Sequence, residues 1–205
     1  SVHPSDLRVL IALCSGTFLA SLITLAPPPF FPAMARDLHV GVPVLGQIMT
    51  AMLLLSAPLG LLFGPLSDSM GYRRLILAGL GTALATLLIF GLAPAFQVLI
   101  LASVTGAVTT AAVPGPSLAL AGTYFPGLAG QRAVSYVSGT AALAAIVGVP
   151  GLAAIGVVAS WRVAYVTVAG AAVVACIIAF LGLPHSRKAY VPPGVAATIA
   201  SYGPL

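Results

Sequence analysis

Long uncharged, mostly apolar stretches alternate along the whole chain with short segments that carry charged residues. The widest gap, between Arg74 and Arg132, holds 57 uncharged residues, and the other four long gaps hold 24 to 30. About 20 apolar residues cross a bilayer as a helix, so each shorter gap fits one span and the widest fits two. A Gly-Leu-Ala-Pro turn signal at 91–94 divides the widest gap. The pattern predicts six membrane helices, at about 8–32, 44–65, 74–93, 96–122, 132–158 and 161–184.

The composition excludes most other classes of protein. Of 205 residues, 60% are apolar and 5% are charged, whereas soluble domains carry roughly 25% charged residues. The same scarcity excludes a disordered chain and a nucleic-acid-binding protein, and no segment alternates in polarity as a β-barrel strand does. We therefore predict an all-α, multi-pass protein of the inner or plasma membrane, with a six-helix membrane domain over 1–184 and a cytoplasmic tail over 185–205.

The distribution of Lys and Arg predicts the orientation, because cytoplasmic segments carry an excess of both. If the N-terminus is cytoplasmic, six of these side chains lie inside and two lie outside. The inside set is Arg8, Arg73, Arg74, Arg132, Arg187 and Lys188, and the outside set is Arg36 and Arg162. We therefore expect both termini in the cytoplasm and a single orientation.

The first and fourth predicted helices share features that indicate two inverted three-helix repeats. Both contain clustered prolines, at 27–29 and at 114–116, and both end at a Phe-Pro pair, at 31–32 and at 125–126. Inverted repeats with broken helices at matching positions are typical of secondary transporters and mark the binding site. Coincidence in a chain with 17 prolines is the alternative explanation.

A motif at 64–74 joins the second and third predicted helices. It resembles the loop signature of the major facilitator superfamily, G-x-L-[SA]-D-x-x-G-x-[RK]-[RK]. Gly64 would let helices approach closely, Gly71 would permit a tight turn, and Asp68 would pair with an arginine or face a helix N-terminus. The resemblance implies a conformational latch that holds one access state, with a turn that merely fixes topology as the alternative. The latch residues are Gly64, Asp68, Gly71, Arg73 and Arg74.

Three other stretches are similar to the same family. Residues 32–38 resemble the outer end of a first facilitator helix, and residues 160–165 resemble the start of a sixth. The fifth predicted helix partly resembles the glycine-proline motif of drug antiporters, and close helix packing is its alternative explanation. The residues of this helix-packing motif are Gly139, Gly148, Pro150 and Gly151. Together the resemblance covers 8–184, the N-terminal six helices of a twelve-helix fold, and implies drug-efflux-like transport.

No charged residue lies deep in any predicted span, although embedded charges usually mark proton relays. Many proton-coupled relatives carry an arginine in the fourth helix, and Ala102 stands at that position here. This argues against the family's usual proton route, whereas the antiporter-like fifth helix favours protons as coupling ions. An uncharged path suits neutral or amphipathic solutes, and hydroxyl, amide and phenol groups at helical spacing are its candidate lining. Bonding of these hydroxyls to their own helices is the alternative. The pathway candidates are Thr17, Ser21, Thr24, Gln47, Thr50, Ser103, Thr110, Ser117, Tyr136 and Thr140.

Six helices correspond to half of a facilitator fold, whose path runs between two halves. We expect a parallel homodimer to complete the path; an excised fragment and one half of a heterodimer are the alternatives. The predicted function is secondary-active export of neutral or amphipathic drug-like solutes by alternating access. The rival hypothesis is a structural membrane half that needs a separate partner and does not transport alone. No catalytic or metal-binding set, cofactor site or ATP-binding loop is recognisable in the sequence.

Overall fold

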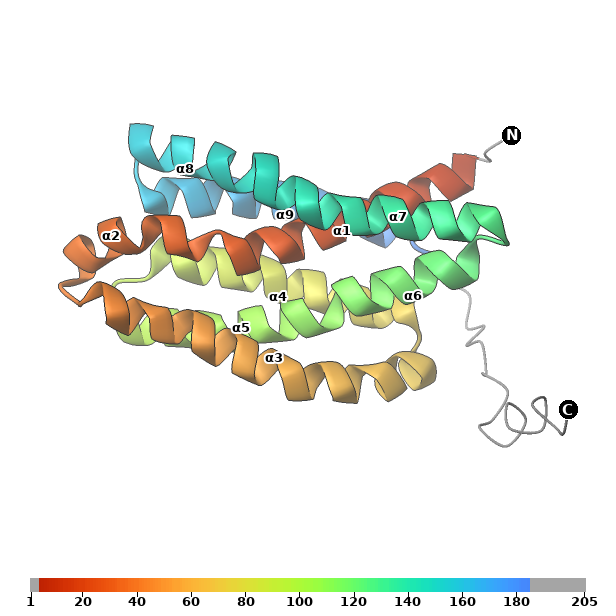
Figure 1. Cartoon of the computed structure of the whole chain (residues 1–205), viewed down its shortest axis with the longest axis horizontal. Coiled ribbons are helices and arrows are strands. Elements are labelled where there is room, and N and C mark those ends of the chain that lie inside the picture. Colours follow the sequence, from red (N-terminus) through yellow and green to blue (C-terminus); the bar gives the residue numbers. More distant parts are fainter. Residues whose placement is uncertain (1–3, 185–205) are drawn as a thin grey trace, which may run out of the picture.

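The computed structural model describes residues 4–184, apart from the side chains of Pro4 and Asp68, so the predicted tail lies outside the described residues. Every regular element within this range is helical. Six helical stretches are long and apolar enough to cross a membrane, which confirms the predicted all-helical, six-span class. The helices run side by side along one axis and form an elongated bundle (Figure 1).

Three spans are single helices and three are interrupted. The single helices are α3 (Val42–Met70), α4 (Tyr72–Leu92) and α9 (Trp161–Gly182). The first span consists of α1 (Pro4–Leu25) and α2 (Pro27–Leu38), and the fourth of α5 (Phe96–Ala112) and α6 (Pro114–Tyr124). The fifth consists of α7 (Leu128–Leu143), a π-helical turn (Ala144–Gly148) and α8 (Val149–Val158).

Prolines explain the interruptions of the first and fourth spans. Pro27 and Pro114 are the first residues of α2 and α6, where a missing N–H costs nothing because the first turn has no intrahelical acceptor for it. The proline cluster at 27–29 therefore starts a new helix, and the span continues past its predicted end at 32, to Leu38. As a consequence, the two Phe-Pro pairs do not occupy equivalent places: the first lies inside α2, and the second follows α6.

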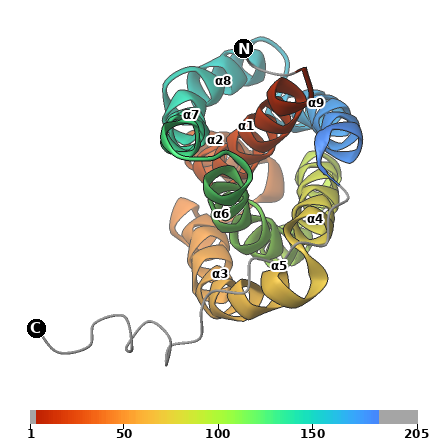
Figure 2. The same cartoon turned by 90° about the vertical axis from the view of Figure 1, so that its right-hand side faces the viewer.

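The helices are unequally covered by the rest of the chain. End-on, α1 lies between the α7–α8 span and α9, and α3 and α7 lie at opposite edges of one side, with α6 between them (Figure 2). In the most apolar part of the second and fifth spans only 11% of the residues are buried, against 39% to 50% in the other four. The second span is α3, and the fifth is α7 with α8. Their uncovered faces therefore meet lipid or another polypeptide.

Candidate functional site

Two threonine hydroxyls meet where the first and fourth spans are interrupted. The Oγ1 atoms of Thr24 and Thr110 are 3.2 Å apart, between α1 and α5. Thr24 Oγ1 also lies 3.0 Å from the carbonyl oxygen of Ala20, and Thr110 Oγ1 lies 2.9 Å from that of Gly106. Each hydroxyl has one proton, so one of the two donates across the pair while the other donates to its own helix.

The backbone around this pair is rich in hydrogen-bond acceptors. In an α-helix the carbonyl of residue i accepts from the N–H of residue i+4. Pro28 and Pro114 stand four residues after Thr24 and Thr110 and have no N–H. The carbonyls of both threonines therefore lose the donor that an unbroken helix would supply. A solute with N–H or O–H groups fits such a place better than an anion does.

Further hydroxyls of the same two spans are buried. Thr17 of α1 and Ser117 of α6 are 3% and 0% exposed, and neither hydroxyl has a hydrogen-bond partner within residues 4–184. Ser103 is also fully buried, but it donates to the carbonyl of Leu99 at 3.2 Å. Ser21 is half-buried. Six of the ten pathway candidates lie on the first and fourth spans, and two of these six have unsatisfied hydroxyls, which are costly unless water or a ligand binds them.

A groove of about 560 Å³ runs between α3 and the α5–α6 span and includes Thr110. It follows the interruption of the fourth span, since residues on both sides of Val113 line it. Small side chains dominate its walls, and the described side chains in the lining carry no charge. Lining residues include Ser56, Gly60, Gly64, Thr110, Gly115 and Ala119.

Among the ten pathway candidates, Thr110 alone is in the lining of this groove. The four candidates on the second and fifth spans lie elsewhere. Gln47 and Thr50 are exposed on α3, and Thr50 donates to the carbonyl of Gly46 at 3.3 Å. Tyr136 of α7 is 60% exposed. Thr140, one turn further along α7, donates to the carbonyl of Val137 at 2.6 Å. For Thr50 and Thr140 the structure therefore shows the alternative stated above, in which the hydroxyl bonds to its own helix.

The latch segment is mostly helical. Residues 64–70 continue α3, and the connection to α4 is Gly71 alone, with φ of 86°, a conformation that glycine adopts readily. Gly64 does not bring two helices of this chain together, because a β-carbon there would have no neighbour within 4 Å in the described part of the chain. It borders the groove instead. The pairing of Asp68 lies outside the described residues and stays a prediction.

Arg73 binds the far end of α9. Its Nε donates to the carbonyl of Leu183 at 3.1 Å and its Nη2 to that of Phe180 at 2.9 Å. The guanidinium also lies over the Phe180 ring, 5.1 Å from its centroid. Since the last carbonyls of a helix have no intrahelical donor and attract cations, Arg73 fixes α9 to the start of α4. Arg74 is exposed.

At the other end of the bundle, Arg162 makes the reciprocal contact. It lies at the start of α9, and its Nη2 donates to the carbonyl of Ala93, just after α4, at 3.0 Å. Asp37 at the end of α2 accepts from Arg162 Nη1 at 2.9 Å and from Trp161 Nε1 at 2.7 Å. This Asp37–Trp161–Arg162 cluster joins three spans. The sequence indicated these residues only through two separate family resemblances, at 32–38 and 160–165, and did not predict that they meet.

The glycine-proline motif of the fifth span surrounds the π-helical turn. Gly148 packs against α1, since a β-carbon there would lie 3.0 Å from Leu22 and 3.1 Å from Phe18. Gly139 and Gly151 face open space within the range that the structure covers, and Pro150 is exposed. Among the four residues of this motif, only Gly148 is therefore closely packed against another helix of the described chain. Single π turns are frequent at functional sites.

Sequence reasoning missed a set of hydroxyls between α4 and α5. Thr82 Oγ1 lies 2.9 Å from Thr109 Oγ1, and Thr86 donates to Thr105 at 2.8 Å. The available signal was the spacing of four residues between Thr82 and Thr86, and likewise between Thr105 and Thr109. This spacing places both threonines of each helix on one face. Such hydrogen bonds, with small residues between the helices, are typical of packing inside membranes.

Six spans, with proline interruptions in the first and fourth and an uncharged groove along the fourth, define a polytopic membrane protein built like a secondary transporter. The sequence profile of the Major Facilitator Superfamily matches residues 13–201, and the chain belongs to this superfamily of membrane transporters. No curated protein matches the chain.

Proposed function

We propose that the protein is a secondary-active transporter that exports neutral or amphipathic drug-like solutes by alternating access. The observation that carries this proposal is the uncharged groove beside the Thr24–Thr110 pair, at the interruptions of two spans. Transporters place their substrate sites at such interruptions, because freed backbone groups there can bind the solute.

The chemistry of the site supports the choice of substrate class. Its polar groups are hydroxyls and backbone carbonyls, and the described side chains of the groove include no cation for a phosphate or carboxylate. Anionic solutes would need such a partner. Solutes with a hydrogen-bond donor and an apolar body fit both the carbonyls of Thr24 and Thr110 and the small apolar walls.

We further propose that a second copy in the same orientation completes the path. The exposed faces of α3 and of the α7–α8 span support this part, because they flank the side of the bundle on which α6 lies (Figure 2). A groove open to hydrocarbon would leave polar groups in lipid, which costs free energy. A different six-helix half that covers the same faces is the rival arrangement.

Coupling to protons would need a route other than an embedded acid. The described Asp and Arg residues lie at the ends of the spans, and Ala102 fills the family's fourth-helix arginine position as a fully buried side chain. A pH gradient is therefore one of the driving forces to test, beside a solute gradient alone.

The test is export of an amphipathic dye from proteoliposomes, with and without a pH gradient, for the wild type, Thr110→Val and Thr123→Val. Thr123 is the matched control, because within residues 4–184 its exposed hydroxyl bonds only to its own helix, to the carbonyl of Ala119 at 2.9 Å and to that of Leu120 at 3.3 Å. We expect transport that Thr110→Val lowers and Thr123→Val preserves. Dye movement no faster than in empty liposomes would refute the proposal.

The native mass in detergent tests the assembly separately. A species of twice the 20.5 kDa chain mass supports the homodimer. A stable monomer that transports only after a different half is added would support the rival arrangement.

A further inference from the structure

Two buried hydroxyls without a partner lie on the neighbouring helices α1 and α6. Thr17 Oγ1 and Ser117 Oγ are shielded from solvent, and neither has a hydrogen-bond partner within residues 4–184. Other hydroxyls of the same two spans, at Thr24, Ser103 and Thr110, can each bond to the carbonyl four residues earlier in their own helix. Thr17 and Ser117 do not use that carbonyl, so both hydroxyls are available to a partner outside their own helices.

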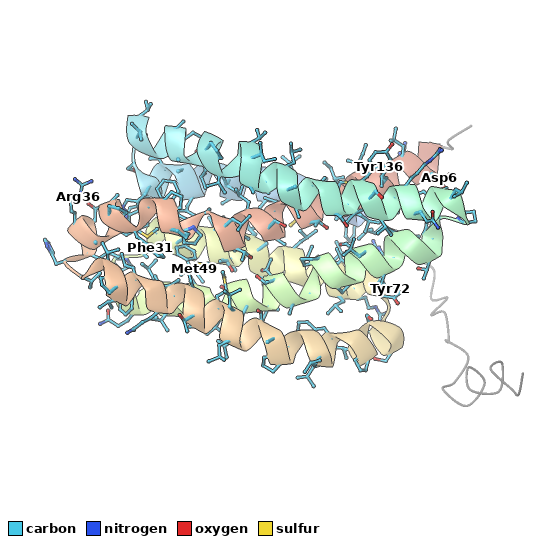
Figure 3. The ribbon with its side chains drawn as sticks, viewed as in Figure 1. Asp6, Phe31, Arg36, Met49, Tyr72 and Tyr136 are labelled. Carbon is cyan, nitrogen blue, oxygen red and sulfur yellow. The ribbon has the colours of Figure 1, made fainter. Side chains whose placement is uncertain are left out.

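Two contacts show how α1 lies along the fourth span. Thr24 Oγ1 is 3.2 Å from Thr110 Oγ1. The hydroxyl of Tyr124, at the end of α6, donates to Asp6, in the first turn of α1, at 3.5 Å. Figure 3 shows Asp6 toward one end of the bundle and Arg36 of α2 toward the other. Residue numbers therefore rise along the first span in the direction in which they fall along the fourth.

The spacing along both spans places Thr17 opposite Ser117. Thr17 stands seven residues before Thr24, and Ser117 stands seven residues after Thr110. Seven residues make about two helical turns, or about 10.5 Å of rise, and return a side chain to nearly the same face. The interruption at Val113 keeps this register, because its backbone is still right-handed helical and its carbonyl accepts from the N–H of Ser117 at 3.0 Å. Since the spans run in opposite directions, the two hydroxyls lie at the same level of the interface.

Apolar groups enclose this level of the interface. A β-carbon at Gly16 would lie 3.5 Å from Val113, so α1 and the fourth span are close together here. The residues one turn before and one turn after each hydroxyl are at most 1% exposed. They are Leu13 and Ala20 on the first span, and Val113 and Ala121 on the fourth. A closely packed and uncharged place of this kind admits a small neutral molecule and excludes a drug-like solute.

We propose that one water molecule binds between Thr17 and Ser117 and joins α1 to α6. It accepts a hydrogen bond from one hydroxyl and donates one to the other, so both buried groups are satisfied. Buried waters commonly serve polar groups that would otherwise stay unsatisfied, and a bond through water is nearly as favourable as a direct one. Thr17 and Ser117 therefore bind water and not the solute, and their role does not depend on transport.

The first test compares the unfolding temperatures of Thr17→Val, Ser117→Ala and the double variant in detergent. Each single change removes one hydrogen bond of the water and should lower the unfolding temperature by about 2 to 4 °C. The double variant should lose less than the sum of the single losses, because it leaves no polar group without a partner. A higher unfolding temperature in both single variants would overturn the proposal, because it would mean that the wild-type hydroxyls are unsatisfied.

Ser103→Ala is the matched control for these variants. Ser103 is as buried as Ser117, but its hydroxyl donates to the carbonyl of Leu99 in its own helix. The double variant of Thr17→Val with Ser103→Ala should therefore show the sum of its two single effects. The same deviation from additivity in this control would overturn the specific link between Thr17 and Ser117. A monodisperse elution profile for each variant ensures that the comparison concerns folded protein.

Radiolytic labelling with hydroxyl radicals detects the water itself. An X-ray pulse converts bound water into radicals, which oxidise the side chains beside it, so Leu13, one turn from Thr17, should be oxidised although it is fully buried. Leu99 is equally buried beside a hydroxyl that already has a partner, and it should stay unlabelled. The label on Leu13 should disappear in the variant that combines Thr17→Val with Ser117→Ala. An unlabelled Leu13 in the wild type would overturn the proposal, and a loss in both single variants would then indicate a direct bond between the two hydroxyls.

Discussion

The hydroxyls of Thr24 and Thr110 lie 3.2 Å apart, and each threonine stands four residues before a proline in the first turn of the helix that follows the interruption. Both residues therefore combine a hydroxyl with a carbonyl that has lost its usual donor. Each hydroxyl can also bond to its own helix, at Ala20 or Gly106. A solute can thus replace either hydroxyl as the partner of the other, and no polar group is left unsatisfied in the exchange.

The first prediction concerns the hydroxyls of this pair. Thr24→Val and Thr110→Val should each lower solute affinity about fivefold, because one neutral hydrogen bond contributes about 1 kcal/mol. The double variant should lose less than the product of the two single effects, since the residues act as a pair. Solute-dependent transport rates in proteoliposomes measure this.

Protein stability supplies the control for that prediction. The hydroxyl that remains in each single variant keeps its own helix carbonyl, so the unfolding temperature should change little. If the loss of affinity in the double variant instead equals the product of the two single losses, the two hydroxyls bind the solute independently. A large drop in unfolding temperature would mean that the pair only holds the helices together.

A second prediction concerns Arg73 and Arg162, which bind the opposite ends of the α4–α9 pair. Replacing either with Gln removes charge-assisted bonds to terminal carbonyls and should lower the free energy of unfolding by about 1 to 2 kcal/mol. Arg73→Lys should recover only part of the loss, because one ammonium does not match two carbonyls as the guanidinium fork does. Thermal unfolding in detergent measures these effects. Arg74→Gln is the control, because Arg74 is exposed. An equal loss of stability in this variant would mean that the change in net charge, and not the bonds to the carbonyls, causes the effect.

A third prediction uses Trp161, the single tryptophan of the chain, as a reporter. Trp161 is buried and donates to Asp37 at 2.7 Å. Asp37→Ala should shift the emission to longer wavelength and increase quenching by acrylamide, because the end of α2 loses its contact with α9. Asp37→Asn keeps an acceptor for the indole and should stay close to the wild type. The ion pair itself should contribute little, since both partners are at least 36% exposed. Identical spectra for all three proteins would contradict this role of Asp37.

Charge spacing and span length were enough to predict six membrane helices, because hydrocarbon thickness leaves few alternatives. The family motif predicted the superfamily, and clustered prolines predicted where two spans break. The contacts of Arg73 and Arg162 could not be predicted, because their acceptors are backbone carbonyls more than 65 residues away, and a carbonyl leaves no residue-specific signal. Similarly, the sequence around Gly64 does not show whether this glycine packs against another helix or lines a groove.

A fourth prediction compares two glycines of α4 that lie two residues apart. A β-carbon at Gly79 would lie 2.6 Å from Val113 and 2.9 Å from Ala112, whereas open space surrounds Gly81 within residues 4–184. Gly79→Ala should separate α4 from α5 and lower the free energy of unfolding by about 1 to 3 kcal/mol, the cost of overpacking. Gly81→Ala should be neutral or stabilising by up to about 1 kcal/mol. Chemical unfolding of both variants measures the difference, and equal effects would contradict the close approach of α4 and α5 at Gly79.

The last prediction separates a transport role of the groove from a structural one. Gly64 borders the groove and Gly170 lies on the exposed side of α9, and both have open space around them within the described chain. A leucine at either place should therefore leave folding intact, but Gly64→Leu fills part of the groove that Thr110 also lines and should abolish most of the transport. Gly170→Leu should transport as the wild type does. If Gly64→Leu instead shifts the native mass from dimer to monomer, Gly64 contacts a second copy, because a bulky side chain prevents close approach of helices. That result would favour the structural role of this segment over a solute path.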